Sequence, residues 1–75
     1  MIQNNKLIHS IIEILKQRRI IVRKEMDYLE WQSQKANKYN DLEALSVLND
    51  KYIIYSKELE KIDNLLDYYE NANEE

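Results

Sequence analysis

The chain contains neither glycine nor proline in its 75 residues. These two residues mark most tight turns and strand ends, so a sequence without them offers few places where the backbone can reverse. Cysteine is also absent, which removes disulfide bonds and thiolate metal sites. Helix is the structure that such a sequence favours, and we expect an all-α fold in a single domain, residues 1–75.

Apolar residues in the first half of the chain occur in pairs that repeat every seven positions. This spacing predicts a helix over about residues 5–33 with a broad buried stripe. Arg18 and Arg19 stand where the next apolar residues of the stripe are due, between Leu15 and Val22. The pairs are Leu7/Ile8, Ile14/Leu15, Ile21/Val22 and Tyr28/Leu29.

The second half carries a regular heptad pattern, which predicts another helix over about residues 41–69. The polar segment 34–40 is the expected loop, and Asn40 or Asp41 is the expected N-terminal cap, with Glu43 as a capping-box partner of Asn40. The acidic tail, residues 70–75, is expected to fray. The two heptad rows are Leu45, Tyr52, Leu59, Leu66 and Leu48, Tyr55, Ile62, Tyr69.

Two helices of similar length with a short connection predict an antiparallel, coiled-coil-like hairpin. A hairpin of this size buries only a modest core. We therefore expect two copies to associate as a homodimer, forming a four-helix bundle. No apolar run is long enough to span a bilayer and no signal peptide is recognisable, so we expect a cytoplasmic protein without membrane contact.

The stretch KQRRIIVRK, residues 16–24, contains five of the eleven basic residues. A nucleic-acid interface is one interpretation, because Lys and Arg bind phosphates. The alternative is pairing across the hairpin, which would place Arg18 and Arg19 beside residues 56–60, with Glu58, Glu60 and Asp63 as acidic partners. Residues 1–24 carry a net charge of +5 and residues 25–75 a net charge of −8. This asymmetry favours internal pairing, and nucleic-acid binding is the third of the functions considered.

Four large apolar residues fall outside the predicted seams: Ile20, Trp31, Ile53 and Ile54. Several such residues on a small hairpin indicate a second contact surface, for a partner protein or a second copy. His9 has no cysteine or second histidine with which to share a metal ion, so we expect neither a metal nor a cofactor. Ser56 has no histidine nearby on the predicted hairpin, and no glycine-rich phosphate loop exists. We expect no active site of the usual hydrolase kind.

The segment Ser56-Lys57-Glu58-Leu59-Glu60-Lys61-Ile62 resembles the Ser-Gln-Glu-Leu-Asp signature of the stage-zero sporulation protein E family. Members of that family are small helical-hairpin aspartyl-phosphate phosphatases that act on response regulators. The resemblance implies that Ser56, Glu58 and Leu59 contact the regulator and that Glu60 stands where the family has aspartate. A second alignment places Asp63 at the aspartate position but has no serine.

Taken together, these patterns predict a small regulatory or adaptor protein that acts by binding another protein. Its expected contact residues are Ile20, Trp31, Ile53, Ile54, Ser56, Glu58 and Leu59. The alternative function, implied by the resemblance alone, is that of a response-regulator phosphatase with Glu60 or Asp63 as the catalytic acid.

Overall fold

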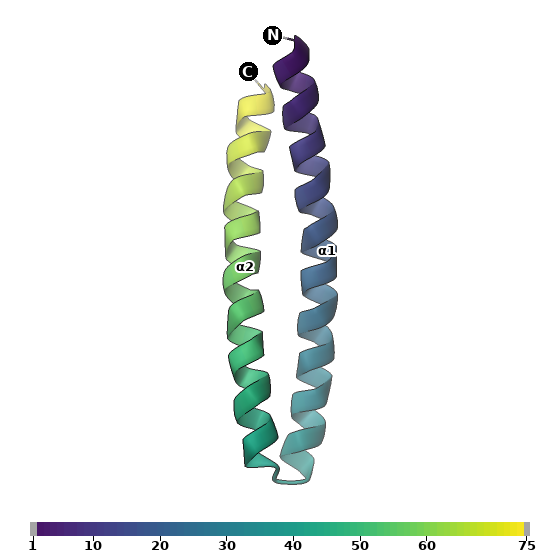
Figure 1. Ribbon diagram of the computed structural model, residues 1–75, viewed down its shortest axis with the longest axis vertical. Helices are drawn as coiled ribbons and strands as arrows, with labels where there is room; N and C mark the ends of the chain where they lie inside the picture. The colour runs from purple at the N-terminus through teal and green to yellow at the C-terminus, as the bar shows by residue number, and fades with distance from the viewer. Residues whose placement is uncertain (1, 75) are drawn as a thin grey trace.

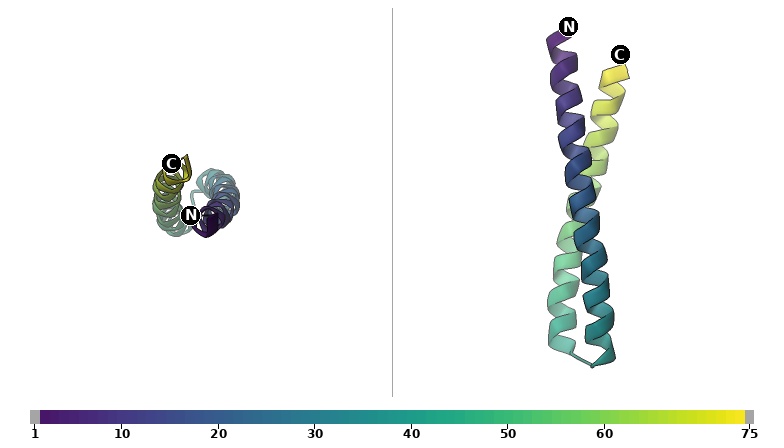
Figure 2. Two further views of the ribbon diagram at one scale, coloured as in Figure 1. Left: turned by 90° about the horizontal axis from the view of Figure 1, so that it is seen from above. Right: turned by 90° about the vertical axis from the view of Figure 1, so that its right-hand side faces the viewer.

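The computed structural model describes the backbone of residues 2–74 and the side chains of residues 5–72. Two long helices, α1 (Ile2–Lys38) and α2 (Leu42–Glu74), run antiparallel and are joined at one end by residues 39–41 (Figure 1). The molecule measures 57 × 14 × 13 Å, and the helices stay side by side along its length (Figure 2). The predicted all-α helical hairpin is confirmed.

The helix boundaries differ from the predicted ones at both ends of the connection. Helix α1 does not end near Ser33 but continues to Lys38, so the predicted loop 34–40 shrinks to residues 39–41. Ser33 and Ala36 are partly buried, because they extend the inward rows of Met26 and Leu29 by one more heptad. Lys35 and Lys38 lie in the last turn, where positive charge interacts favourably with the helix dipole.

The acidic tail also differs from the prediction. Residues 70–74 continue α2 as regular helix, and only residue 75 of the expected frayed segment lies outside the described backbone. Tyr69 and Ala72 are partly buried near the end of the helix, so this segment has side chains facing inward. Propagating an existing helix costs little once its first turn has formed.

Asn40 is the residue at which the chain turns, in place of the glycine that the sequence lacks. Its φ angle of 54° lies in the left-handed region, where glycine or asparagine usually ends a helix. The amide of Asp41 donates to the carbonyl of Ala36 at 2.9 Å, and the amide of Asn40 donates to the carbonyl of Asn37 at 3.1 Å. These two hydrogen bonds form a Schellman motif with asparagine at the left-handed position.

Asp41 begins the second helix immediately after the first one ends. Its Oδ1 accepts a hydrogen bond of 3.1 Å from the amide of Ala44, as an N-terminal cap does. Of the two caps considered, Asp41 therefore fills the position, and Glu43 is not at the third helical residue that a capping box requires. Glu43 still places a negative charge in the first turn, where the helix dipole favours it.

The core is a narrow seam between the helices. Among residues 5–72, five apolar side chains are buried: Ile12, Val22, Leu29, Ile62 and Leu66. Six more pack against this seam while partly buried, namely Ile8, Leu15, Met26, Tyr55, Leu59 and Tyr69. All the α2 residues among these buried and partly buried side chains belong to the two predicted heptad rows.

The predicted broad stripe on α1 is only partly covered. In each apolar pair the second residue turns toward α2, and the first remains exposed, as with Ile21 (50% exposed) beside Val22 (fully buried). One neighbouring helix covers about two heptad rows, so a third row has nothing to pack against. The uncovered residues are Leu7, Ile14, Ile21 and Tyr28.

Candidate protein-binding surface

Arg18 forms the best-defined polar contact between the helices. Its Nη2 donates to Oε1 and Oε2 of Glu58 at 2.8 and 3.0 Å, and its Nε lies 3.2 Å from both oxygens. The hydrogen bond and charge of Glu58 raise the pKa of Arg18, so this guanidinium stays protonated throughout the usable pH range. The predicted position of Arg18 beside residues 56–60 is confirmed.

Arg19 reaches an acid one turn farther along α2. Its Nε donates to Oδ1 of Asp63 at 2.8 Å, beyond the segment 56–60 expected for it. Both cross-helix pairs are at least one-third exposed, and such pairs contribute only about 0–1 kcal/mol each. Their main effect is on register, because a slip of one turn would separate both arginines from their acids. Two cations of the basic stretch are thus engaged within the hairpin.

The four apolar residues predicted as a contact surface are all exposed, with 43 to 65% of each residue accessible. They do not form one patch, however. Ile54 lines a groove together with Tyr28, whereas the groove formed by Arg23, Met26, Asp27, Tyr52 and Leu59 lies on the opposite side. Ile20 is seven residues before Asp27 and therefore belongs to that opposite side.

The two sides of the hairpin have different chemistry. We call one the apolar side: it contains the uncovered row of α1 and four residues of α2, each 44 to 67% exposed. Its residues are Leu7, Ile14, Ile21, Tyr28, Val47, Ile54, Leu65 and Tyr68. The other we call the polar side; on α2 it carries Ser56, Glu60, Asp63 and Asp67, and Ile53 is its large apolar residue there.

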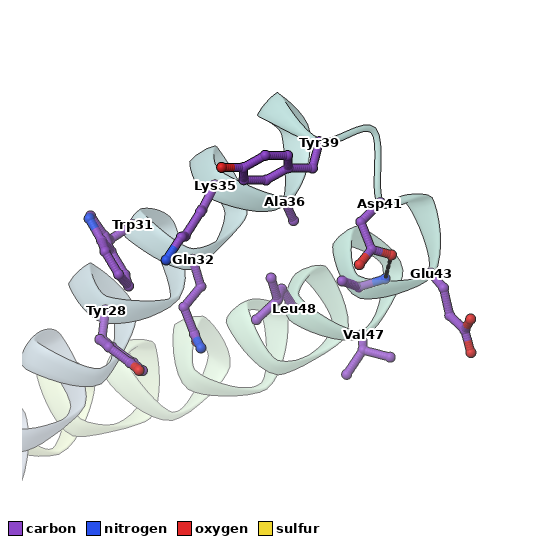
Figure 3. A pocket seen from close by; sticks show the side chains of 11 residues that line it. Tyr28, Trp31, Gln32, Lys35, Ala36, Tyr39, Asp41, Glu43, Val47 and Leu48 are labelled. Carbon is purple, nitrogen blue, oxygen red and sulfur yellow. Dashed lines mark hydrogen bonds between the residues drawn. The ribbon is translucent and has the colours of Figure 1, made fainter.

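A groove of about 810 Å³ lies on the apolar side next to the hairpin tip (Figure 3). Tyr28 and Trp31 stack with their ring centroids 5.9 Å apart, and Nζ of Lys35 lies 5.0 Å from the centre of a Trp31 ring. Both contacts hold the indole in place while leaving it 54% exposed. The other lining residues are Gln32, Ala36, Tyr39, Asp41, Glu43, Ala44, Val47 and Leu48.

The motif-like segment of α2 is divided between different environments. Glu58 is held by Arg18, and Leu59 is partly buried against the core. Ser56 and Glu60 are both exposed and four residues apart, so they share one face of the helix. Asp63 is exposed as well, but its carboxylate accepts the hydrogen bond from Arg19.

Sequence reasoning identified Trp31 and Ile54 but missed Tyr28, Val47 and Tyr39, which also line the apolar side or its groove. Tyr28 belongs to an apolar pair, and the pair pattern predicts that it lies in the buried stripe. A usable signal was present, since two adjacent positions on a helix lie 100° apart and a single partner helix cannot cover both rows fully.

His9 is exposed, and within the described residues no cluster of three metal-ligating side chains occurs. Neither described helix combines the length and the apolar character that a membrane crossing requires. Comparisons with protein-family models, with curated proteins and with solved structures give no match to this chain.

Proposed function

We propose that this chain is a small adaptor or regulatory protein that binds another protein through the groove at its hairpin tip. The observation that carries the proposal is the stacked, exposed pair Tyr28 and Trp31 beside that groove. Tyrosine and tryptophan are enriched at the energetic centres of protein interfaces, because they bury a large area at low conformational cost.

The groove has the composition expected of a protein-binding site. Its lining includes the apolar Val47 and Leu48 from α2 and charges of both signs in Lys35, Asp41 and Glu43. Apolar lining supplies affinity, and charged groups supply orientation. A partner helix with an apolar ridge fits this arrangement, since helices commonly bind in apolar grooves between other helices.

The tip is also well ordered by its own hydrogen bonds. The Schellman motif at Asn40 and the cap formed by Asp41 fix the ends of both helices that line the groove. A preformed groove loses little conformational entropy on binding, which raises affinity without additional contacts. The short connection thus contributes to binding by holding Tyr39 and Val47 at a set separation.

Site-specific photo-crosslinking in cells that produce the protein tests this proposal. A photoreactive phenylalanine derivative at Tyr39, which is 70% exposed at the groove, should give a discrete product with a second protein. Trp31→Ala should remove that product, because the indole side of the groove is lost. The same probe at the exposed Asn64, away from the groove, is the matched control. Equal products from both positions, or a product insensitive to Trp31→Ala, would contradict the proposal.

A second candidate function is the response-regulator phosphatase implied by the resemblance of residues 56–62. The supporting observation is that Glu60 is exposed on the same face as Ser56 and forms no ion pair with a described residue. A free carboxylate of this kind could orient water at a phospho-aspartate of a docked partner. Dephosphorylation of a phosphorylated response regulator should then be accelerated by the wild type and not by Glu60→Ala. Identical decay with and without the wild type would exclude this function.

A further inference from the structure

The hairpin exposes more surface than a compact monomer of the same mass does. Its accessible area is 6292 Å², whereas a compact monomer of 9.1 kDa exposes about 4,900 Å². The difference of roughly 1,400 Å² arises because the molecule is only two helices thick. A stable interface of standard size buries about 800 Å² on each partner. One copy therefore has ample area for an interface along its length.

The excess apolar area is concentrated on the apolar side. Leu7, Ile14, Ile21 and Tyr28 follow each other at intervals of seven. On α2, Val47, Ile54 and Tyr68 occupy three of four positions with this spacing, and Lys61 occupies the fourth. Tyr28 shares one groove with Ile54 and another with Val47, which shows that the two rows face the same way. Seven half-exposed residues in two aligned rows, with Leu65 on the same side, form an extended apolar surface, unlike single exposed apolar residues scattered over a protein.

We propose that a second copy of this chain covers the apolar side, giving a two-fold symmetric four-helix bundle. The occupant must present apolar side chains every seven residues over about four heptads, because that is the spacing and length of the exposed rows. The apolar side of an identical hairpin has this spacing and this length. A self-complementary patch on both partners is also the usual form of a two-fold interface.

The polar groups on this side are compatible with being covered. Arg18 and Glu58 lie three or four residues from Ile21 and Ile54, and Nε and Nη2 of Arg18 already hold both carboxylate oxygens of Glu58. Covering such a pair leaves no charge without a partner, which is the condition under which ion pairs are tolerated inside interfaces. Glu25 and Lys51 carry opposite charges and line the same groove as Tyr28 and Ile54. Lys51 and Lys61 have long aliphatic stems, so their ammonium groups can remain at the edge of the bundle.

The proposed dimer and the proposed tip-binding function share Tyr28 and Val47, so a partner protein at the tip groove would compete with the second copy at that end of the hairpin. The dimer concerns the length of the hairpin and requires only the purified chain. The tip function concerns a different protein and requires Trp31 and Tyr39. Loss of one interaction would leave the other testable by its own assay.

Two adjacent isoleucines provide a matched pair for the test. Ile21 is 50% exposed on the apolar side, and Ile20 is 56% exposed on the other side. Sedimentation equilibrium of the purified wild type should give the mass of two chains. On dilution the dimer should dissociate, and the measured mass should fall toward that of one chain. Ile21→Glu should raise the dissociation constant at least about tenfold, since a buried unpaired carboxylate costs more than the ~1.4 kcal/mol that a factor of ten represents. Ile20→Glu should change it less than about twofold.

A wild-type mass of one chain at the highest soluble concentration would overturn the proposal. Equal weakening by Ile20→Glu and Ile21→Glu would also overturn it. Helix content, measured by circular dichroism on the same samples, must be unchanged for the comparison. If Ile21→Glu loses helicity, the comparison with Ile20→Glu uses Ile14→Glu in its place. Ile14 lies in the same row as Ile21 and is 65% exposed.

Discussion

Replacing Ile62 by alanine is expected to lower the free energy of unfolding by about 2–5 kcal/mol. Ile62 is only 5% exposed and belongs to the central cluster with Ile12, Val22 and Leu66. Truncation removes buried methyl groups and leaves a cavity that two straight helices cannot close without bending. A hairpin with so few buried side chains has little stability in reserve, so much of its helix content should be lost at room temperature.

The control for this substitution is Ile53→Ala on the same helix. Ile53 is 43% exposed and lies outside the central cluster, so its truncation should change the free energy of unfolding by about 0.5 kcal/mol or less. Urea denaturation followed by circular dichroism measures both values at one fixed protein concentration, because the proposed association would make apparent stability concentration-dependent. Similar losses for the two variants would mean that the seam described above is not the core.

Replacing Asn40 by valine is expected to destabilise the hairpin by about 1–2 kcal/mol. The backbone at residue 40 has a φ angle of 54°, which a β-branched side chain adopts only with steric strain. Relieving that strain would break the hydrogen bonds from the amides of Asn40 and Asp41 and release the ends of both helices. The same urea experiment gives the change.

Asn40→Gly is the matched variant at this position. Glycine adopts the left-handed conformation without strain, so stability should remain within about 0.5 kcal/mol of the wild type. The comparison separates the need for a left-handed residue from any specific role of the asparagine side chain. Equal loss from the glycine and valine substitutions would show that the side chain, and not the backbone conformation, determines the turn.

The seven-residue spacing made the seam predictable, but it could not say which member of each apolar pair faces inward. Ile21 and Val22 are both strongly apolar and adjacent, so composition does not separate them. Only the position of α2 does, since it buries Val22 completely and leaves Ile21 half exposed. The rows on α2 were easier to predict because every heptad position in them holds a large apolar residue, whereas Arg18 and Arg19 interrupt the stripe of α1.

The turn was harder to locate than the helices. The polar residues between Ser33 and Asn40 resemble a loop in composition, yet most of them form the exposed surface of the last turns of α1. Without glycine, asparagine is the favoured left-handed residue, and the region offers two candidates, Asn37 and Asn40. Hydrogen bonds at the tip, which depend on both helices, select Asn40.

The charge pattern predicted one feature of the candidate site well and another poorly. Arg18 lies opposite Glu58, as the antiparallel pairing implied, and its role in register follows from the sequence. The contact surface does not follow from the sequence, because residues outside the seam can lie on either side of a hairpin. Ile20 and Ile54 looked equivalent in the sequence, but the helix rotation places them on opposite sides.

Hydroxyl-radical footprinting of the wild type at low and high protein concentration tests most directly whether the apolar side is the surface through which this chain associates. We predict that Leu7, Tyr28 and Tyr68 become protected as concentration rises, while Ile20 and Ile53 keep their reactivity. Protection of Ile20 and Ile53 in place of the apolar side, or reactivity that is independent of concentration at every position, would contradict this account.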